Sequence, residues 1–526
     1  MAAAWRRSLV LVVAVVVALT ASLATGSAQA AEPSPVPAAG GTLTSGQRAA
    51  LLTIARDTWR FFAADVDPTT ALPLDHLGPG NIRGNYTSAA NVGVYLWSVV
   101  SAADLGLITR ADATALAAST LRTVARMPRA HGLLYQWYDT RTAKVISNPG
   151  EPACDPAAAR ARDNCSFLSA VDNGWYASGL FVLRKALPGL RPVVDRLVAD
   201  LDFSIFYDKR PQTACNVNAD IDDQPTGQQY GGFFVGSGPA EYHNGALYSD
   251  PRISMYVGLG LHQMPGDVWW RTWRTLPPKR CATDPDNSTQ GQWPAQGKWV
   301  TYTDPQSGKA FPVWEGHYIY PGTDLDYLPT FAGGMFEALM ANLVVPETQW
   351  GRRGLGRADV LTAQVQMQYA REELGFPVWG LSPSSTPDDT GGYGIYGVGG
   401  LEFASQSQLA ICPTCATETT VTPHASFLAL DVAPVAAYRN IATLQRLYPG
   451  IYKQNGGFYD AVDPVTGTVG HRRLVLDQSM IMAALANVLT TDGGPRRWFA
   501  RDPASAAAKL YLSMETMTLT GVGSTP

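Results

Sequence analysis

The pattern of apolar and polar positions along this chain is mainly helical. Apolar side chains recur at spacings of three and four residues in one segment after another. Glycine or proline separates many of these segments, so that one helix is expected to end at Gly106 and Thr109 to cap the next. The predicted helices cover residues 47–65, 89–105, 110–126, 174–185, 190–206, 250–258, 333–343, 358–373, 423–447 and 476–489.

Long connections rich in Gly, Trp, Tyr and Asp separate the helix pairs, at residues 224–248, 293–329 and 379–406. Long loops within a compact domain usually carry function. Strand–helix–strand alternation is not visible, which argues against a Rossmann or TIM-barrel arrangement. Successive helix pairs with such loops at one end predict an all-α toroid, forming one large domain over residues 47–515 with a tail at 516–526.

The beginning of the chain has the pattern of an export signal. Arg6 and Arg7 precede an apolar run, and Ala28-Gln29-Ala30 supplies small residues at a cleavage site. We therefore expect residues 1–30 to be a signal peptide, compatible with either Sec or Tat export, and residues 31–46 to be a flexible leader. The expected location is extracellular, with no membrane association after signal removal.

Composition narrows the choice of partners. Charged residues make up 16% of the chain and aromatic residues 10%, and the formal net charge is −4. Without a basic run, the sequence argues against nucleic acid and anionic membranes. The aromatic content suits neutral sugar rings, although a large aromatic core explains it equally well. No motif for a cofactor or a metal is apparent, so we expect a monomer that needs neither and binds a polysaccharide or oligosaccharide.

The six cysteines form three pairs of near neighbours in the sequence. In an oxidising compartment they are expected to form disulfides. Fifteen connectivities are possible, and we predict that neighbours pair. The predicted disulfides are Cys154–Cys165, Cys215–Cys281 and Cys412–Cys415.

Nine segments along the chain form an ordered set of loop motifs. They are residues 85–93 (NYTSAANVG), 132–139 around YQWY, 168–175 (LSAVDNGW), 247–252 (LYSDPR), 331–337 (FAGGMFE), 379–382 (WGLS), 422–426 (TPHAS), 456–461 (GGFYDA) and 477–480 (DQSM). In content and order the chain resembles the glycoamylase-like family over residues 51–503. That family includes endo-β-1,2-glucanases and the transglycosylating domain of cyclic β-1,2-glucan synthases. The resemblance implies an (α/α)6 toroid and glycoside hydrolase activity.

Glycoside hydrolysis requires two carboxyl groups, one on each side of the scissile bond. The resemblance places the catalytic acid within residues 248–252, where the glucanases carry Glu and this chain has Asp250. Because Asp is one methylene shorter, the proton donor would lie about 1 Å further back, which can cost about 100-fold in rate. Three explanations remain: a deeper substrate, an acid role moved to Glu241 or Glu337, or a different substrate.

The other candidate catalytic carboxyl groups are Asp460, Asp172 and Glu337. Asp460 follows a glycine-rich loop, Asp172 opens a helix, and Glu337 follows Gly333-Gly334. Asp250 and Asp460 form the leading pair. Turn formation or helix capping is the alternative role for each of the aspartates.

Candidate substrate-binding residues are aromatic or polar side chains within the same motifs. Indole and phenol rings stack on sugars, while core packing is the alternative for each aromatic. The candidates are Tyr86, Trp137, Trp175, Arg252, His317, Trp379 and Asp477.

Together these features predict a secreted glycoside hydrolase, with an inverting mechanism favoured. The expected substrate is a neutral polysaccharide, either β-1,2-glucan-like or an actinobacterial cell-wall glycan. Two other readings remain open: a polysaccharide lyase on a similar toroid, and a carbohydrate-binding protein without catalysis.

Overall fold

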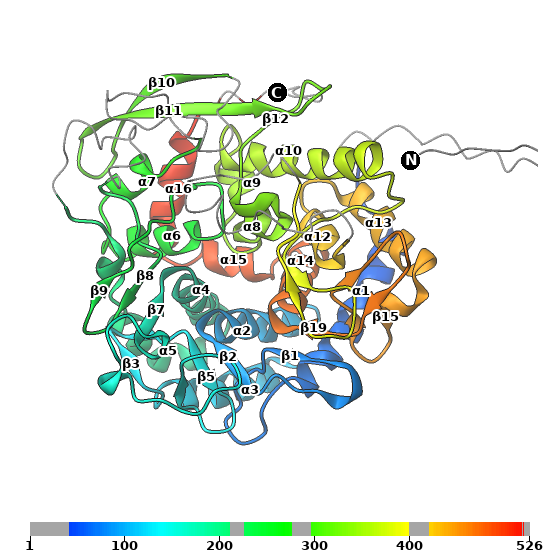
Figure 1. Cartoon of the computed structure of the whole chain (residues 1–526), viewed down its shortest axis with the longest axis horizontal. Coiled ribbons are helices and arrows are strands. Elements are labelled where there is room, and N and C mark those ends of the chain that lie inside the picture. Colours follow the sequence, from blue (N-terminus) through cyan, green and yellow to red (C-terminus); the bar gives the residue numbers. More distant parts are fainter. Residues whose placement is uncertain (1–40, 211–225, 276–295, 399–419, 518, 520–526) are drawn as a thin grey trace, which may run out of the picture. The chain divides into compact units, whose positions relative to one another are not determined.

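Helices dominate the computed structural model, which describes residues 41–210, 226–275, 296–398, 420–517 and 519 (Figure 1). The described helices are α1 (Ser45–Ala64), α2 (Ala89–Asp104), α3 (Arg110–Val124), α4 (Ala170–Ala186), α5 (Arg191–Asp200), α6 (Arg252–Gly260), α7 (Asp267–Arg271), α8 (Met335–Leu339), α9 (Glu347–Trp350), α10 (Leu355–Gln368), α12 (Pro423–Leu428), α13 (Pro434–Leu447), α14 (Val475–Leu489), α15 (Pro495–Ala500) and α16 (Ser505–Met514).

Every predicted helical segment contains a helix, with two informative differences. The segment 423–447 divides into α12 and α13, because Pro434 lacks the N–H that a continuous helix would need and instead stands in the first turn of α13. The helices α7, α9, α15 and α16 were not predicted; α7 and α9 have four or five residues, too few to show a helical period. Thr109 caps α3 as predicted, and its hydroxyl accepts a hydrogen bond from the backbone N–H of Asp112.

Six helices pack against one another in a closed cycle. Helix α2 packs on α4, α4 on α6, α8 on α12, α12 on α14, and α14 on α2 (Figure 1). Between α6 and α8 the guanidinium of Arg252 donates to the carbonyls of Glu337 and Ala338. Helices α3, α5, α10 and α13 each pack against one helix of this cycle, and α1 packs against both α14 and α2. The result is a helical ring of paired helices.

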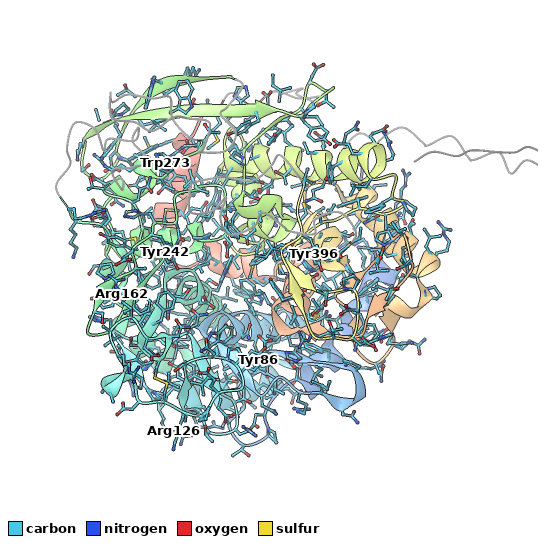
Figure 2. All side chains as sticks on the ribbon, in the orientation of Figure 1. Tyr86, Arg126, Arg162, Tyr242, Trp273 and Tyr396 are labelled. Carbon is cyan, nitrogen blue, oxygen red and sulfur yellow. A yellow bond between two sulfur atoms is a disulfide. The ribbon has the colours of Figure 1, made fainter. Side chains whose placement is uncertain are left out.

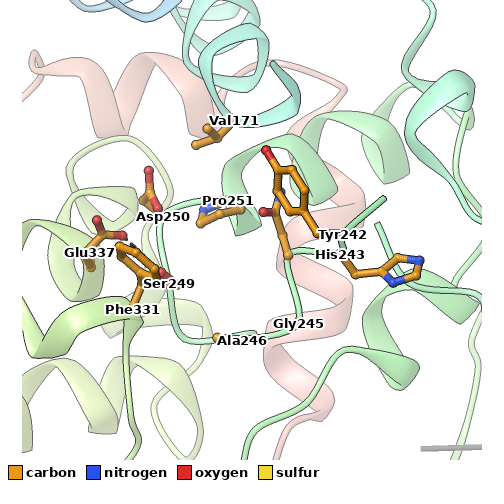
Figure 3. A pocket seen from close by; sticks show the side chains of 11 residues that line it. Val171, Tyr242, His243, Gly245, Ala246, Ser249, Asp250, Pro251, Phe331 and Glu337 are labelled. Carbon is orange, nitrogen blue, oxygen red and sulfur yellow. Dashed lines mark hydrogen bonds between the residues drawn. The ribbon is translucent and has the colours of Figure 1, made fainter. Parts of the chain in front are cut away.

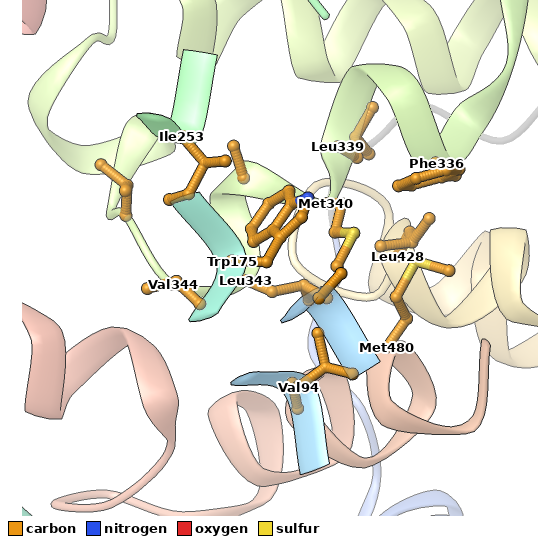
Figure 4. Close-up of a cluster of buried hydrophobic side chains, with 14 of the residues drawn as sticks. Val94, Trp175, Ile253, Phe336, Leu339, Met340, Leu343, Val344, Leu428 and Met480 are labelled. Carbon is orange, nitrogen blue, oxygen red and sulfur yellow. The ribbon is translucent and has the colours of Figure 1, made fainter. Parts of the chain in front are cut away.

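The inside of the ring is filled by side chains from all six helices. Figure 4 shows Val94, Trp175, Ile253, Met340, Leu428 and Met480, one from or beside each helix of the cycle, together in one buried cluster. Helices α2 and α4 approach most closely at glycines. A β-carbon on Gly93 would lie 2.3 Å from the Trp175 carbonyl oxygen, and one on Gly179 would lie 2.4 Å from the Gly93 carbonyl oxygen. Only glycine permits that approach.

Short antiparallel strands occupy the loops between helix pairs, which the all-α prediction did not include. They are β1 (His76–Leu77), β2 (Tyr86–Ser88), β3 (Arg129–Ala130), β4 (Leu133–Leu134), β5 (Trp137–Asp139), β6 (Val145–Ile146), β7 (Phe167–Ser169), β8 (Gly232–Phe234), β9 (Gly238–Pro239), β10 (Gln296–Thr303), β11 (Ala310–Ile319), β12 (Asp326–Tyr327), β13 (Ser384–Ser385), β14 (Tyr393–Gly394), β15 (Tyr452–Lys453), β16 (Gly457–Phe458), β17 (Ala461–Val462), β18 (Val469–Gly470) and β19 (Arg473–Leu474).

The longest strands form the β10–β11 hairpin, within a segment predicted as a loop. Phe311 and Val313 are buried, while Pro312 and Trp314 between and beside them are partly exposed. This period of two is the pattern of a half-buried strand and contradicts the loop assignment.

Two further expectations concern disulfides and the membrane. The predicted Cys154–Cys165 disulfide is present, while the Cys215–Cys281 and Cys412–Cys415 pairs lie outside the described residues. Among the helices that the structure describes, none combines the length and the apolar character needed to cross a bilayer.

Candidate active site

Polar side chains converge from the N-terminal ends of the six helices in the ring. Each of five helices contributes one from its first turn, and Asp250 lies two residues before α6. These side chains are Asn91 of α2, Asp172 of α4, Glu337 of α8, His424 of α12 and Asp477 of α14. The positive end of the helix dipole favours carboxylates at such positions. The ring therefore gathers acidic groups at one end.

Tyr393 on β14 lies among these acidic groups. Burial raises its pKa, and so do the charges of Asp477, Glu337, Asp75 and Asp250, in that order. The four carboxyl groups therefore lie in the electrostatic neighbourhood of one phenol. Tyr393 itself is 53% exposed, so solvent reaches its ring.

Asp250 and Glu337 share a pocket of about 480 Å³ (Figure 3). Their side chains hydrogen-bond to each other, and the backbone N–H of Asp250 also donates to the Glu337 carboxyl. The Ser249 hydroxyl donates to Glu337 Oε2 at 3.0 Å. These contacts hold the two carboxyl groups side by side.

Two carboxyl groups in contact cannot both ionise readily. Burial is the main cause that raises the pKa of Glu337 well above its ordinary value, followed by the charge of Asp250. Burial also raises the pKa of Asp250, and the charge of Asp172 adds to it, while the positive charge of Arg252 lowers it. The pair therefore retains one proton at a pH where an exposed carboxyl group has lost it. That proton is available to a leaving group.

Asp172 accepts hydrogen bonds from the hydroxyl of Ser169 and, at 3.4 Å, from the amide of Gln136. Ser169, and not Asp172, is the residue that caps α4. Burial raises the pKa of Asp172. Its charge acts on Asp250, and its neighbour Val171 lines the pocket, so the structure brings this predicted residue close to the pocket without placing it in the lining.

Asp460 and Asp477 form a second group of carboxyls. Asp460 is only 1% exposed, and both of its oxygens are occupied: Oδ2 accepts from the Ser385 hydroxyl and the Leu474 N–H, and Oδ1 from Gln478. Burial, and next the charge of Asp477, raises its pKa. Asp460 is thus a well-held but inaccessible group.

The carboxyl group of Asp477 is as buried as that of Asp460, but it has fewer hydrogen-bond donors around it. Its Oδ2 lies 3.3 Å from His424 Nδ1, and neither atom makes a hydrogen bond of normal geometry with the described residues. His424 is held from its other side by Ser382, 2.8 Å from Nε2. A buried carboxylate oxygen without a donor is unusual in a folded protein. Asp477 Oδ2 therefore keeps an unused acceptor position, although the atom is buried from solvent.

Asp75 is a member of the site that sequence analysis missed. Its carboxyl accepts from the Asn91 amide at 3.0 Å, contacts His76 Nδ1 at 3.0 Å, and accepts from the Tyr86 hydroxyl. Its side chain is 18% exposed, more than those of Asp460 or Asp477. The Asp-His dipeptide has no distinctive spacing, and the only available signal was its position just before the motif at residues 85–93.

Exposed aromatic rings flank the carboxyl groups. Tyr242 is 49% exposed and lines the pocket of Asp250, on the side across from Asp250 and Glu337 in Figure 3. Tyr393 is its counterpart beside Asp477 and Asp75. Neither was among the predicted residues. The predicted Tyr86 and Trp137 do come together, edge to face, with ring centroids 5.6 Å apart.

The structure places several predicted substrate-binding residues away from the surface of the site. Trp175 is 2% exposed, packs edge to face on Trp97 and lies within the buried cluster of Figure 4, so its faces are not available to a sugar. Trp379 is 9% exposed and joins the hydrophobic core. In both cases packing against residues distant in the sequence buries the ring, and Trp175 itself belongs to helix α4.

Arg252 and His317 also take roles other than the predicted one. Arg252 is fully buried and makes a two-point ion pair with Glu347, with both distances 2.8 Å. His317 lies on β11, 3.6 Å from Asp326, and β11 runs along the periphery in Figure 1. The alternative acid Glu241 is 81% exposed at its side chain and pairs with Arg162, so it does not reach the pocket.

Comparison with known proteins identifies relatives of this architecture. A family model described as "Glycoamylase: Putative glucoamylase" matches residues 314–493, and one described as a protein of unknown function (DUF3131) matches residues 53–221. Cyclic beta-(1,2)-glucan synthase NdvB of Rhizobium meliloti is 25% identical over 551 residues. The match covers 87% of this chain and 18% of that relative, so this chain spans less than a fifth of its length.

Solved structures share the fold at low identity. A putative glucoamylase from Bacteroides caccae is 17% identical with a TM-score of 0.61, covering 89% of this chain and 100% of its own. An endo-beta-1,2-glucanase from Chitinophaga pinensis, solved with sophorotriose and glucose, is 14% identical with a TM-score of 0.61, covering 90% and 98%. The shared fold is a helical toroid, and the resemblance inferred from the motifs is confirmed.

Proposed function

We propose, on the premise that this chain resembles the glycoamylase-like family, that it is a glycoside hydrolase that cleaves β-1,2-glucan. The observation that carries the proposal is the proton-sharing pair of Asp250 and Glu337 in an open pocket. The endo-β-1,2-glucanase structures with the same fold support the choice of substrate. We further propose that the paired helices form an (α/α)6 toroid and that residues 1–30 direct secretion.

The pair also accounts for the shorter acid at position 250. With Asp in place of Glu, the carboxyl of residue 250 stands back from the substrate by about 1 Å. Glu337 enters the same pocket from α8 with one more methylene and holds the higher affinity for the shared proton. Glu337 is accordingly the proposed proton donor to the leaving glycosidic oxygen, with Asp250 as its partner.

Asp75 is the proposed base. A general base must touch the water that it deprotonates, and Asp75 presents more surface than Asp460 or Asp477. Asn91, His76 and Tyr86 orient its carboxyl. Water loses a proton to Asp75 and attacks the anomeric carbon while Glu337 protonates the departing oxygen. The reaction inverts the anomeric configuration, as expected when water stands between base and sugar.

The remaining groups bind the sugar chain. Tyr242 and Tyr393 offer exposed ring faces on which neutral pyranose rings stack. The negative charge of Asp172 raises the pKa of Asp250 and so increases the affinity of the pair for its proton.

A glycan panel tests the proposal. The protein is incubated with β-1,2-glucan, other neutral glucans, and cell-wall arabinan and galactan, and reducing ends are measured. The expected result is new reducing ends from β-1,2-glucan, with the product first appearing in the α-anomeric form by proton NMR. Ultraviolet absorbance of an unsaturated uronate would indicate a lyase instead. Binding without new reducing ends would indicate a carbohydrate-binding protein.

A further inference from the structure

A second cavity, of about 370 Å³, lies beside the candidate active site. Its size falls within the range of ligand pockets, roughly 300–1,000 Å³. Three arginines line it: Arg83, Arg141 and Arg472. The acidic residues of its lining are Asp139 and Glu151. The balance of these charges indicates what the cavity binds.

One arginine and one carboxylate of the lining neutralise each other. Arg141 donates to Asp139 Oδ2 through Nη2 at 2.6 Å and through Nε at 3.2 Å. The hydroxyl of Thr142 donates to Asp139 Oδ1 at 3.0 Å. Although burial opposes it, this set of donors lowers the pKa of Asp139. Asp139 is therefore saturated and leaves little negative potential in the cavity.

The other two arginines have no carboxylate partner within 4.0 Å among the residues that the structure describes. Arg472 is oriented by neutral groups: Nη1 donates to the Gly391 carbonyl at 2.8 Å, and Nη2 lies 3.1 Å from His76 Nε2. Arg83 is exposed and makes only a long contact, 3.5 Å, to the Val66 carbonyl. Besides Asp139, the lining contains one further carboxylate, that of Glu151, which is exposed. The cavity has a surplus of positive charge.

Tyr86 joins this cavity to the candidate active site. Its ring lines the cavity, and its hydroxyl donates to Asp75, the proposed base. His76 provides a second connection, because one ring nitrogen contacts Asp75 and the other faces Arg472. A sugar chain that reaches Asp75 is therefore close to two residues that line this cavity.

We propose that this cavity binds an anionic group carried by the glycan, a carboxylate or a phosphate ester on a sugar next to the cleavage point. Guanidinium groups bind both anions through paired N–H donors, whereas neutral sugars do not require a surplus of positive charge. Arg472 is already oriented, and the exposed Arg83 is free to close on the anion. This inference rests on the proposed function and extends it from neutral glucan to glucan that carries anionic substituents.

The test compares β-1,2-gluco-oligosaccharides in three forms: unmodified, succinylated to carry carboxylates, and phosphorylated. The enzyme is expected to show a kcat/KM roughly tenfold or more higher on an anionic form, as one charge-assisted contact provides. The preference should weaken as sodium chloride is raised to about 1 M, where the screening length is about 3 Å. A preference for only one anionic form would identify the group as carboxylate or phosphate.

Variants assign the effect to the cavity. Arg83→Gln should abolish the preference and leave hydrolysis of the unmodified form unchanged, while Glu151→Gln should increase the preference. Arg126→Gln removes the same charge from an exposed position at the periphery (Figure 2) and should change neither. Equal kcat/KM on all three forms, or an equal loss on all three in Arg83→Gln, would overturn the inference.

A measurement of oligosaccharide binding tests the cavity inference independently of the proposed hydrolase activity. Calorimetric titration of the wild-type and Arg83→Gln proteins with the three oligosaccharides does not depend on hydrolysis. If no form is cleaved, the proposed function fails, and tighter binding of an anionic form lost in Arg83→Gln would still support the cavity. If all forms bind equally, the cavity inference fails even where hydrolysis is observed.

Discussion

The carboxyl groups of Asp250 and Glu337 hydrogen-bond to each other across the gap between α6 and α8, and the backbone N–H of Asp250 also donates to Glu337. This contact joins two residues 87 positions apart into one acid that holds a proton. Asp172 on α4 adds negative charge to the pair, and Arg252 adds positive charge. The proton affinity of the pair therefore depends on named neighbours that can be changed one at a time.

The pH profile of activity tests that dependence. Because the donor must be protonated, kcat/KM should fall as pH rises through the raised pKa of the pair. Asp172→Asn removes a charge that raises the pKa of Asp250, so the fall should move to lower pH. Glu241→Gln changes an exposed acidic residue that does not reach the pocket, and it should leave the pH profile of kcat/KM unchanged. An unmoved profile in Asp172→Asn would contradict the electrostatic account.

Stability should depend on pH through the same residue, and the sign can be derived. The folded protein holds the Glu337 proton more tightly than the unfolded chain, whose value is near 4.5. The free energy of unfolding therefore decreases as pH rises above 4.5, by about 1.4 kcal/mol for each unit by which the pKa is raised. Glu337→Gln removes this loss and should be more stable than wild type at pH 8, but not at pH 4. Denaturant titration at both values measures it, and equal stability at pH 8 would contradict burial of an ionisable group.

Arg252 should affect folding and not substrate binding. Its guanidinium is buried in an ion pair with Glu347, and removing one partner leaves the other charge uncompensated. Arg252→Met should lower the free energy of unfolding by roughly 3–5 kcal/mol, and Arg252→Met with Glu347→Leu should recover part of that loss. Chemical denaturation and steady-state kinetics separate the two roles. A raised KM in a protein of unchanged stability would restore the substrate-binding prediction made from sequence.

Tyr393 and Tyr242 should contribute to binding through their ring faces. Replacing either by Ala should raise KM by roughly 2–10-fold, corresponding to about 0.5–1.5 kcal/mol for an aromatic contact. Phe at the same position keeps the face and should remain close to wild type. If Phe is as impaired as Ala, the phenol hydroxyl and not the ring is the binding group.

The predicted helices could be found from the sequence because the spacing of apolar residues within one segment does not depend on the rest of the chain. It also placed Asp250 and Glu337 in motifs that open α6 and α8. The strands β10 and β11 were missed because the segment was assigned by its Gly, Trp and Tyr content, although the alternation around Phe311 and Val313 was present.

Roles that depend on distant neighbours could not be predicted in the same way. Trp175 is buried against Trp97, which lies 78 positions away in the sequence. Arg252 is buried in its ion pair with Glu347, which lies 95 positions away. Asp75 became a candidate only when α2 brought Asn91 to it and its charge was found to act on Tyr393, which lies on β14 between α10 and α12. In each case the side chain has the predicted chemistry, and packing decides whether a sugar can reach it.

The central claim is that the Asp250–Glu337 pair protonates the leaving oxygen of a glycosidic bond, and leaving-group dependence tests it most directly. The measurement compares kcat/KM of wild type and Glu337→Gln on β-1,2-glucan and on a dinitrophenyl β-1,2-diglucoside, whose leaving group needs no proton. The account predicts a loss of roughly 100-fold or more on the glucan and near wild-type activity on the dinitrophenyl substrate. Equal activity of the two proteins on the glucan, or an equal loss on both substrates, would contradict it.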